Sequence, residues 1–145
     1  MSLEFSVEAY LDVVDEMQLL YGANWAETGH EDGLDVDYAA FEQAAPSLHV
    51  TVARENGTLV GYHCVRLTRS WKQKNTLVGI TCMLYLKRSA RKGFNGVKFL
   101  KFTESALREA GVNRFITTAT TRNPFYRLLE RLGFSELERV YTKVL

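Results

Sequence analysis

An apolar run that passes through a basic, glycine-containing segment into a helix constrains this chain more than any other feature. The run covers residues 80–86, the segment is RKGFNG at residues 91–96, and an amphipathic helix extends from there to about Ala110. The first turn of a helix has backbone N–H groups without carbonyl partners, and the helix dipole adds partial positive charge there. This layout therefore predicts a site for an anion, and a phosphate group fits it.

Charge is distributed unevenly along the chain, although the net charge is only +1. Residues 1–55 contain twelve Asp or Glu and a single basic residue, Arg54, whereas residues 56–103 contain ten Lys or Arg and no acid. The basic half is expected to attract an anionic partner, and the acidic half to attract cations or to stay solvated. Basic residues cluster around the glycine segment: Lys87, Arg88, Arg91, Lys92, Lys98 and Lys101.

The length and composition predict one domain over residues 1–145, because 145 residues with 46% hydrophobic content suffice for one core. The start of the chain lacks the features of a signal peptide, and the longest apolar-rich run, 77–86, is far shorter than the roughly 20 residues that span a bilayer. We expect a cytoplasmic protein without membrane contact. Cys64 and Cys82 lack metal-ligand spacing, so both are predicted to be reduced core residues, and no metal site is expected.

Hydrophobic periodicity and turn residues predict a mixed α/β fold. The Asn56-Gly57 pair joins two strands into an antiparallel hairpin, and a later strand, helix and strand form a βαβ unit with parallel strands. Ser6 is expected to cap the first helix, and Asn123 with Pro124 to start the last one. Helices are expected over residues 7–21, 37–44, 96–110 and 125–132, a loop over 22–36, and strands over 48–54, 58–67, 76–86, 114–121 and 134–145.

With these features the chain resembles the GNAT superfamily of N-acetyltransferases over residues 48–145, and phage-encoded members look similar through the helix that begins at Gly96. The family's acyl-CoA motif has Arg or Gln, two residues, Gly, one residue, and Gly or Ala. Arg91 and Gly96 stand in register, while Phe94 replaces the middle glycine and Gly93 precedes it. A glycine at that position lets the backbone approach a pyrophosphate closely, whereas a phenylalanine side chain must point away.

The resemblance implies a mixed-sheet acyl-CoA N-acyltransferase fold with acetyl-CoA as cosubstrate, in which residues 1–47 form the acceptor side. The backbone of Leu84 and Leu86 would bind the pantetheine arm like an added strand, in a gap beside the strand 114–121. Backbone amides of the glycine segment would hold the pyrophosphate, with nearby side chains for the remaining phosphate charge. The implied cofactor-binding residues are Leu84, Leu86, Arg88, Arg91, Lys92, Gly93, Phe94, Asn95, Gly96 and Asn123.

The implied reaction is direct attack of a primary amine on the thioester. Many family members place an acidic tyrosine four residues before the glycine of the Gly133-Phe134 pair, where this chain has Leu129. Tyr126, one turn earlier, is the candidate catalytic acid. Alternatively, its side chain packs at the start of the helix or stacks on the coenzyme. The strand 76–86 contains no acid that could act as base. His30 and His63 are either bases or ordinary surface and core histidines.

The acceptor is not specified: a small amine, a protein N-terminus or a lysine side chain all remain open. An acidic loop at the acceptor side either attracts a cationic amine or is simply solvated; its residues are Glu27, Glu31, Asp32, Asp35 and Asp37. Because Phe94 and Leu129 depart from the family pattern, the alternative function is a protein-interaction module on the same fold. Trp71 lies among basic residues, yet no nucleic-acid motif is present, so nucleic-acid binding is not expected. An exposed strand edge at the C-terminus leaves a homodimer open.

Overall fold

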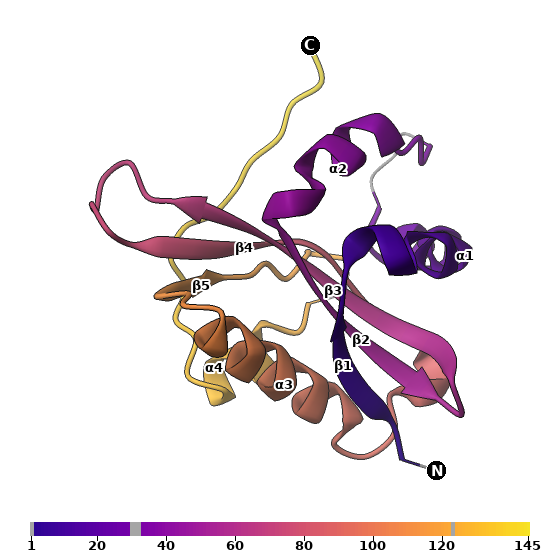
Figure 1. Cartoon of the computed structure of the whole chain (residues 1–145). Helices are drawn as coiled ribbons and strands as arrows, with labels where there is room; N and C mark the ends of the chain where they lie inside the picture. The colour runs from indigo at the N-terminus through magenta and orange to yellow at the C-terminus, as the bar shows by residue number, and fades with distance from the viewer. Residues whose placement is uncertain (1, 30–32, 123) are drawn as a thin grey trace.

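A five-stranded mixed sheet runs through the molecule in the order β1-β2-β3-β4-β5 (Figure 1). The computed structural model describes residues 2–29, 33–122 and 124–145. Neighbouring strands from β1 to β4 are antiparallel, and β5 runs parallel to β4. The strands are β1 (Glu4–Glu8), β2 (Leu48–Glu55), β3 (Thr58–Arg69), β4 (Leu77–Leu86) and β5 (Arg114–Ile116). The predicted hairpin and the parallel βαβ pair are therefore confirmed.

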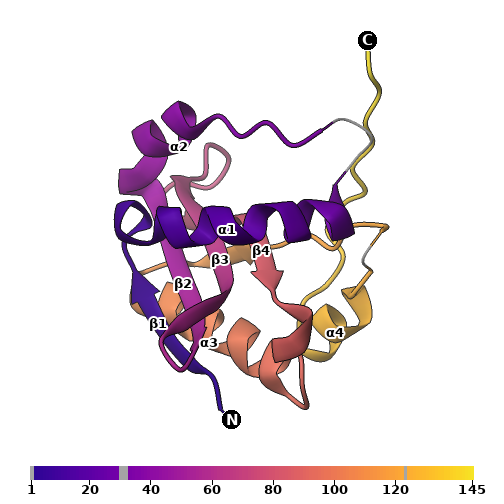
Figure 2. The ribbon, with the colours of Figure 1, turned by 90° about the vertical axis from the view of Figure 1, so that its right-hand side faces the viewer.

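Helices cover both faces of the sheet, with α1 and α2 on one side and α3 and α4 on the other (Figures 1 and 2). Two short 3-10 turns, η1 (Ala45–Ser47) and η2 (Arg88–Ala90), precede β2 and follow β4. Within the described ranges no helix has both the length and the apolar character that a membrane crossing requires. The helices are α1 (Tyr10–Thr28), α2 (Tyr38–Ala44), α3 (Asn95–Glu109) and α4 (Tyr126–Arg131).

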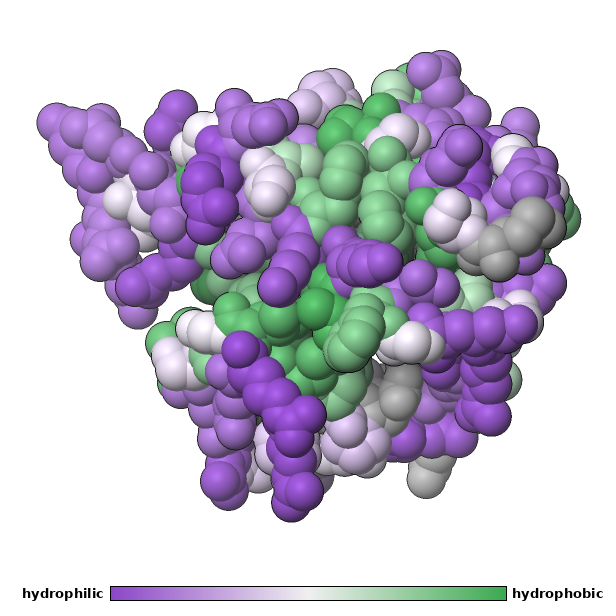
Figure 3. All heavy atoms as spheres, turned by 90° about the horizontal axis from the view of Figure 1, so that it is seen from below, coloured by the Kyte–Doolittle hydropathy of each residue, from purple (hydrophilic) through white to green (hydrophobic). Residues whose placement is uncertain are grey.

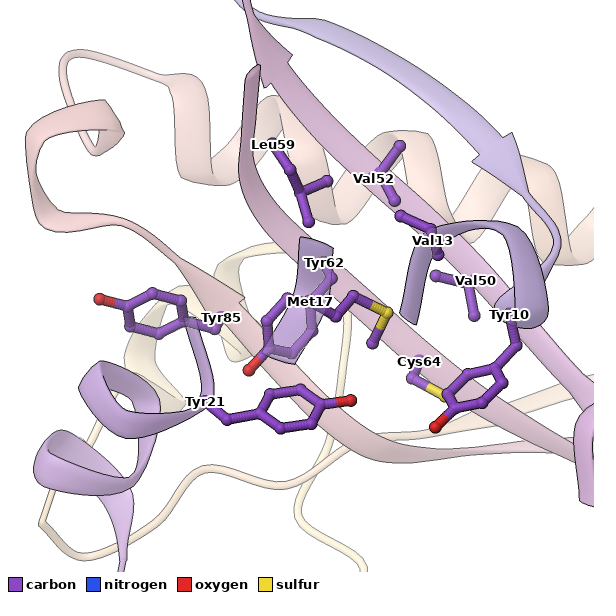
Figure 4. Packing of buried hydrophobic residues seen from close by; sticks show 10 residues of the cluster. All are labelled: Tyr10, Val13, Met17, Tyr21, Val50, Val52, Leu59, Tyr62, Cys64 and Tyr85. Atoms are coloured by element: carbon purple, nitrogen blue, oxygen red, sulfur yellow. The ribbon is translucent and has the colours of Figure 1, made fainter. Parts of the chain in front are cut away.

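The core on the α1 face follows from helical spacing. Buried side chains recur every three or four residues along α1 and meet alternate residues of β2 and β3 (Figure 4). Tyr21 lies edge-on to Tyr62, with ring centroids 5.7 Å apart. The labelled cluster comprises Tyr10, Val13, Met17, Tyr21, Val50, Val52, Leu59, Tyr62, Cys64 and Tyr85.

The opposite face of the sheet is closed by α3. Phe99 is 1% exposed and stacks on Phe5 of β1, with ring centroids 5.5 Å apart. Thr103 lies buried below it, and its hydroxyl is 2.7 Å from that of Thr51 on β2. Seen from below, Figure 3 shows apolar side chains gathered near the middle of the face and hydrophilic ones around them. A single layer of helix on each face thus encloses the sheet.

The N-terminal segment differs from the prediction of a helix over 7–21 followed by a loop over 22–36. Residues Glu4–Glu8 form β1, which pairs antiparallel with β2, so Ser6 lies in a strand and does not cap a helix. The helix begins at Tyr10 and continues to Thr28. The prediction was wrong because the free edge of β2 offers β1 a complete ladder of hydrogen bonds, which local helix propensity cannot report.

The C-terminal part contains less strand than predicted. The strand expected over 114–121 ends at Ile116, and residues 134–145, expected to form the last strand, have no strand structure. Figures 1 and 2 show this tail leaving the body as an extended segment. A β-rich composition becomes a strand only where a partner edge is available, and the described chain provides none here. The helix expected over 125–132 is confirmed as α4, although it begins at Tyr126 with Phe125 as the N-cap and not at the predicted Pro124.

Candidate functional site

The site begins where β4 and β5 separate. The two strands pair only from Val78–Arg114 to Ile80–Ile116. Beyond Ile80, β4 continues to Leu86 and stays paired with β3, while no strand in the described structure pairs with its other edge. The predicted pantetheine-binding residues Leu84 and Leu86 both lie on this open stretch. Unpaired backbone groups of this kind can bind an extended ligand as an added strand.

A β-bulge at Cys82 interrupts β4 within the open stretch. Val65 of β3 pairs with Thr81 and Cys64 pairs with Met83, so Cys82 is an extra residue without a partner in the register. Met83 packs in the core on the α1 side, and Leu84 packs on the opposite side. The bulge therefore presents two consecutive side chains, Cys82 and Met83, to the α1 side of the sheet.

A cavity of about 370 Å³ lies on that side. Its walls come from the second half of α1, the segment before α2, the bulged part of β4 and the segment after β5. The lining is mainly apolar and aromatic, with a few hydroxyl, amide and carboxylate groups. The lining residues are Tyr21, Asn24, Trp25, Thr28, Leu34, Asp35, Val36, Asp37, Phe41, Thr81, Cys82, Met83, Leu84, Thr118, Thr120 and Phe125.

Among the described residues of the predicted acidic loop, two of the three line the cavity. Asp35 and Asp37 line it, and the carboxylate of Asp37 also caps α2 by accepting a hydrogen bond from the amide of Ala40 at 3.0 Å. The third, Glu27, lies on α1 and forms ion pairs with Arg88 and Arg91. His30, Glu31 and Asp32 lie outside the described residues.

The predicted anion cradle lies between η2 and the first turn of α3. Gly93 adopts a φ of +56°, a left-handed conformation that glycine accommodates without strain, and a Cβ at Gly96 would meet no atom within 4 Å. In the described structure, the amides of Gly93, Phe94, Gly96 and Val97 have no hydrogen-bond acceptor. The side chain of Phe94 is 74% exposed, so it leaves this backbone accessible.

Glu27 holds the arginines of the cradle. Its carboxylate accepts hydrogen bonds from Arg88 Nε at 3.1 Å and from Arg91 Nη2 at 2.8 Å. Although burial raises the pKa of the Glu27 carboxyl, the hydrogen bonds from Arg91 and Arg88 outweigh it and keep the pKa below its ordinary value. Arg91 also donates through Nε to the carbonyl of Leu86 at 2.6 Å and lies over the ring of Tyr85.

The side chain of Asn95 shapes the same turn by donating to the carbonyl of Ala90 at 3.0 Å. Lys92 is exposed beside it. Arg88 and Arg91 thus meet at Glu27 next to the 92–96 segment, and phosphate binding by these groups stays a prediction. Asn123, the last of the predicted cofactor-binding residues, lies outside the described residues.

His63 reaches the site only indirectly. Its Nε2 lies 2.8 Å from the hydroxyl of Thr81, which in turn donates to the hydroxyl of Thr117 at 2.9 Å across the mouth of the gap. The imidazole is fully buried on the α3 side, and this desolvation lowers its pKa to about 3. His63 is therefore a neutral ring at physiological pH and a poor acceptor of protons.

The two cysteines differ from each other, and the prediction that both lie in the core is wrong for Cys82. Cys64 is buried, whereas Cys82 is exposed and lines the cavity. The pKa of the Cys82 thiol is lowered to about 7, chiefly by a hydrogen bond with the Cys64 thiol and also by the backbone and charge of Arg66. The pKa of Cys64 is raised by the same hydrogen bond and by burial.

Tyr126, the sequence candidate for the acid, is the first residue of α4 and is half exposed. The guanidinium of Arg127 lies 6.0 Å from the centre of its ring. The preceding residue, Phe125, lines the cavity, whereas Tyr126 does not. Leu129, at the position of the family's tyrosine, is buried in the core.

The α1 wall of the cavity was missed from the sequence. Tyr21, Asn24, Trp25 and Thr28 follow each other at helical spacing and face the cavity together. That spacing was the available signal, but Gly22 led to a loop assignment. The structure tolerates this glycine inside α1, at the usual small loss of helix stability.

Comparison with solved structures gives the same fold at low sequence identity. A ribosomal-protein-alanine N-acetyltransferase from Brucella melitensis biovar Abortus 2308 matches with a TM-score of 0.80 and 14% identity over 100% of this chain and 99% of that one. An aminoglycoside acetyltransferase from an uncultured soil metagenomic sample, in complex with sisomicin, gives 0.76 and 14%, covering 99% and 96%. A predicted acetyltransferase from Clostridium acetobutylicum with acetyl-CoA gives 0.74 and 13%, also covering 99% and 96%.

No curated protein matches this sequence. The family model described as "Acetyltransferase (GNAT) family" matches residues 12–134, which is most of the chain and includes the open stretch of β4, the cradle and α4. The resemblance, stated from the sequence for residues 48–145, is thereby confirmed, and the match extends toward the N-terminus as far as residue 12. This chain belongs to the GNAT family of acetyltransferases.

Proposed function

We propose that the protein transfers the acetyl group of acetyl-CoA to a primary amine by direct attack. The observation that carries this proposal is the open edge of β4 from Thr81 to Leu86, which connects the cradle at one end with the cavity at the other. An extended acyl carrier bound along that edge has its phosphates at the start of α3 and its thioester near the bulge.

Each part of the path has a function in the proposed reaction. The free amides of Gly93, Phe94, Gly96 and Val97 bind the pyrophosphate, helped by the α3 dipole and the charges of Arg88, Arg91 and Lys92. The open backbone of Leu84 and Leu86 positions the arm, although the carbonyl of Leu86 must exchange its bond with Arg91 for one with the ligand. A backbone N–H at the bulge polarises the thioester carbonyl while the amine attacks from the cavity.

The leaving thiolate needs a proton, and Tyr126 is the hydroxyl that the sequence offers for it. Tyr126 is half exposed and does not line the cavity, so its role in the proton step needs a direct test. Replacing Tyr126 by Phe removes only the hydroxyl. A lower turnover number with unchanged acetyl-CoA affinity assigns the proton step to Tyr126, and an unchanged turnover number removes it from the mechanism.

A cationic amine fits the cavity as the acceptor. The carboxylate of Asp35 supplies negative charge at the wall, and the lining includes the aromatic residues Tyr21, Trp25 and Phe41, a residue type that attracts ammonium groups. Among structures of the same fold, one enzyme binds sisomicin and another is named for the alanine of a ribosomal protein. These two chemistries, a polycationic sugar and a protein N-terminus, define the acceptors to test first.

Calorimetric titration with acetyl-CoA tests the proposal before any acceptor is known. We expect micromolar binding that weakens as salt rises, because phosphate contacts are screened. Gly96→Glu places a bulky anion where the pyrophosphate would lie and is expected to lower the affinity at least about 100-fold. Gly22→Glu makes the same substitution in the exposed part of α1, where a Cβ also meets nothing within 4 Å, and is expected to leave the affinity unchanged.

Turnover is then measured with sisomicin and with a peptide that begins with alanine. Absence of binding at millimolar acetyl-CoA would contradict the proposal and favour the alternative, a protein-interaction module on the same fold. Equal loss of affinity in both glycine variants would also contradict the cradle assignment, because it would show a general defect in folding.

A further inference from the structure

The bulge on β4 places a thiol in the cavity whose chemistry the proposed reaction has not used. Cys82 is the extra residue of the bulge, is exposed and lines the cavity between Thr81 and Met83. Its Sγ lies 3.8 Å from the carbonyl oxygen of Ile80, and the Cys64 thiol on β3 together with Arg66 lowers its pKa. A sulfur that receives hydrogen bonds and a nearby positive charge is stabilised as a thiolate.

The other candidates for proton transfer are less favourably placed. His63 touches the site only through Thr81 and is buried as a neutral ring. Tyr126 is absent from the lining of the cavity. Asp37 is occupied by its hydrogen bond to the first turn of α2. Cys82 alone among these groups combines exposure to the cavity with a position on the open part of β4.

The position of Cys82 relative to the coenzyme follows from the path described above, so this inference rests on the proposed function. With the phosphates at the start of α3, the arm runs back along β4 from Leu86 toward Thr81. Four residues of strand separate Leu86 from Cys82, which is about 13 Å at the rise of an extended strand. The reactive sulfur at the end of the arm therefore arrives beside the bulge.

We propose that Cys82 is a catalytic proton-transfer residue. Its thiolate takes one proton from the amine nitrogen as that nitrogen forms the new C–N bond with the acetyl carbon. The C–S bond of acetyl-CoA breaks, and CoA leaves as a thiolate. The Cys82 thiol then gives the same proton to the CoA sulfur. The products are the N-acetylated amine and CoA with its thiol protonated, and the Cys82 thiolate is regenerated.

The acidity of the two sulfurs suits this exchange. The Cys82 thiol, with its pKa lowered to about 7, is a stronger acid than an ordinary thiol at about 8.5, so the transfer to the CoA thiolate is favourable. Cys64 and Arg66 of β3 act on its pKa, and the other ionisable groups that line the same cavity are Tyr21 of α1 and Asp35 and Asp37 of the segment before α2. The assignment gives both proton steps to one residue and leaves none for Tyr126.

CoA disulfide is a probe of the position of Cys82 that needs no acceptor. The Cys82 thiolate attacks one sulfur of the disulfide, a mixed Cys82–CoA disulfide forms, and one CoA thiolate leaves. We expect CoA disulfide to modify the protein at least about tenfold faster than glutathione disulfide, which lacks the phosphates that bind the cradle. Intact mass and peptide mapping identify the site. Cys82→Ala removes the reaction, and Gly96→Glu removes the preference for CoA disulfide.

The environment of the thiol is tested by its alkylation rate with iodoacetamide as a function of pH. The wild type is expected to show a midpoint near 7, and Cys64→Ala a midpoint shifted up toward the ordinary value of about 8.5 because the hydrogen bond is lost. The same upward shift is expected in the pH profile of kcat/KM. A purely structural role for Cys64 would not move either midpoint.

Turnover with the better of sisomicin and the alanine peptide tests the catalytic step. Cys82→Ser keeps the size of the side chain but cannot ionise, so we expect kcat to fall at least about 100-fold with the acetyl-CoA affinity unchanged. Turnover within threefold of wild type in Cys82→Ser would overturn the proposal. So would equal rates with the two disulfides in a protein that binds acetyl-CoA. If acetyl-CoA does not bind at all, the proposed function fails first, and calorimetry distinguishes that outcome.

Discussion

The two halves of the sheet differ in how completely their strands are paired. β2 and β3 are paired from Leu48–Arg66 to Glu55–Thr58, and β3 with β4 over nearly the whole of both strands. β4 and β5 are paired at three positions only. The fully paired half carries the two buried clusters, whereas the sparsely paired half borders the cavity.

This difference separates stability from function. A backbone edge that is fully hydrogen-bonded within the protein cannot bind a ligand, and an edge that binds a ligand cannot contribute those bonds to folding. We therefore expect substitutions in the antiparallel half to change the free energy of unfolding and those around the cradle to change ligand affinity. The following predictions test this division in order of expected effect.

Phe99→Ala is expected to be the most destabilising change, because it leaves a cavity between α3 and the antiparallel half. Phe99 is 1% exposed and stacks on Phe5. The free energy of unfolding should fall by about 3–5 kcal/mol, measured by urea denaturation. Phe134→Ala is the matched control, because Phe134 is partly buried and packs against Phe115 of β5. Its free energy of unfolding should fall by less. Equal losses would contradict the division between the halves.

Arg54→Met removes the ion pairs that join β1, α1 and β2. Arg54 donates to Glu8 and to Glu16, with its closest contacts at 2.8 Å and 2.7 Å. We expect the free energy of unfolding at pH 7 to fall by about 2 kcal/mol, since hydrogen bonds to charged groups contribute roughly this much. Met keeps most of the apolar stem, so packing alone should not account for the loss.

The same ion pairs predict a pH dependence. Hydrogen bonds from Arg54 lower the pKa of both Glu8 and Glu16 in the folded protein. Their stabilisation is complete above the unfolded pKa of about 4.3 and is lost as pH falls through the lowered folded values. The difference in unfolding free energy between wild type and Arg54→Met should therefore shrink below pH 4. A constant difference down to pH 2 would show that the ion pairs do not cause it.

Glu27→Gln tests the region around the cradle, where we expect substitutions to change ligand affinity. The carboxylate of Glu27 occupies Arg88 and Arg91, which the phosphates would otherwise bind. Removing its charge should tighten acetyl-CoA binding about threefold, within the range that exposed ion pairs contribute. Glu104→Gln removes a carboxylate that pairs with Arg108 farther along α3 and should have no effect. Weaker binding in Glu27→Gln would show instead that Glu27 positions the arginines for the ligand.

Deletion of residues 135–145 should have the smallest effect. Its apolar side chains are exposed, from 65% for Leu137 to 85% for Val144 and full exposure for Leu145. The unfolding free energy should change by less than about 0.5 kcal/mol. Light scattering of the full-length and truncated proteins is the accompanying measurement. A larger loss that depends on protein concentration would show that the tail is covered in a homodimer.

Short sequence patterns were sufficient to predict the β2–β3 hairpin and helix α3. The Asn56-Gly57 turn located the hairpin, and the periodicity of 95–109 located α3 with the cradle before it. The sequence did not reveal β1, the short length of β5 or the strand-free tail, because each depends on whether a partner edge is present. For the site, residues close together in sequence, such as Arg91 and Gly96, were predictable as a unit.

Contacts between distant residues were not predictable. The pairing of Glu27 with Arg88 and Arg91 joins residues more than 60 positions apart. The approach of Cys64 to Cys82 depends on the register of β3 and β4 and on a bulge that leaves no trace in composition. Both features arise from strand alignment, which a single sequence does not specify.

The bulge also changes which residues of β4, odd-numbered or even-numbered, face a given side of the sheet. Before it, odd-numbered residues such as Gly79 and Thr81 face α3; after it, even-numbered Leu84 and Leu86 do. Without Cys82, Thr81 and Met83 would be adjacent, the ladder would be regular, and every other side chain would keep its face. The architecture would thus be complete with a strand one residue shorter. What the additional residue contributes is a thiol at the wall of the cavity.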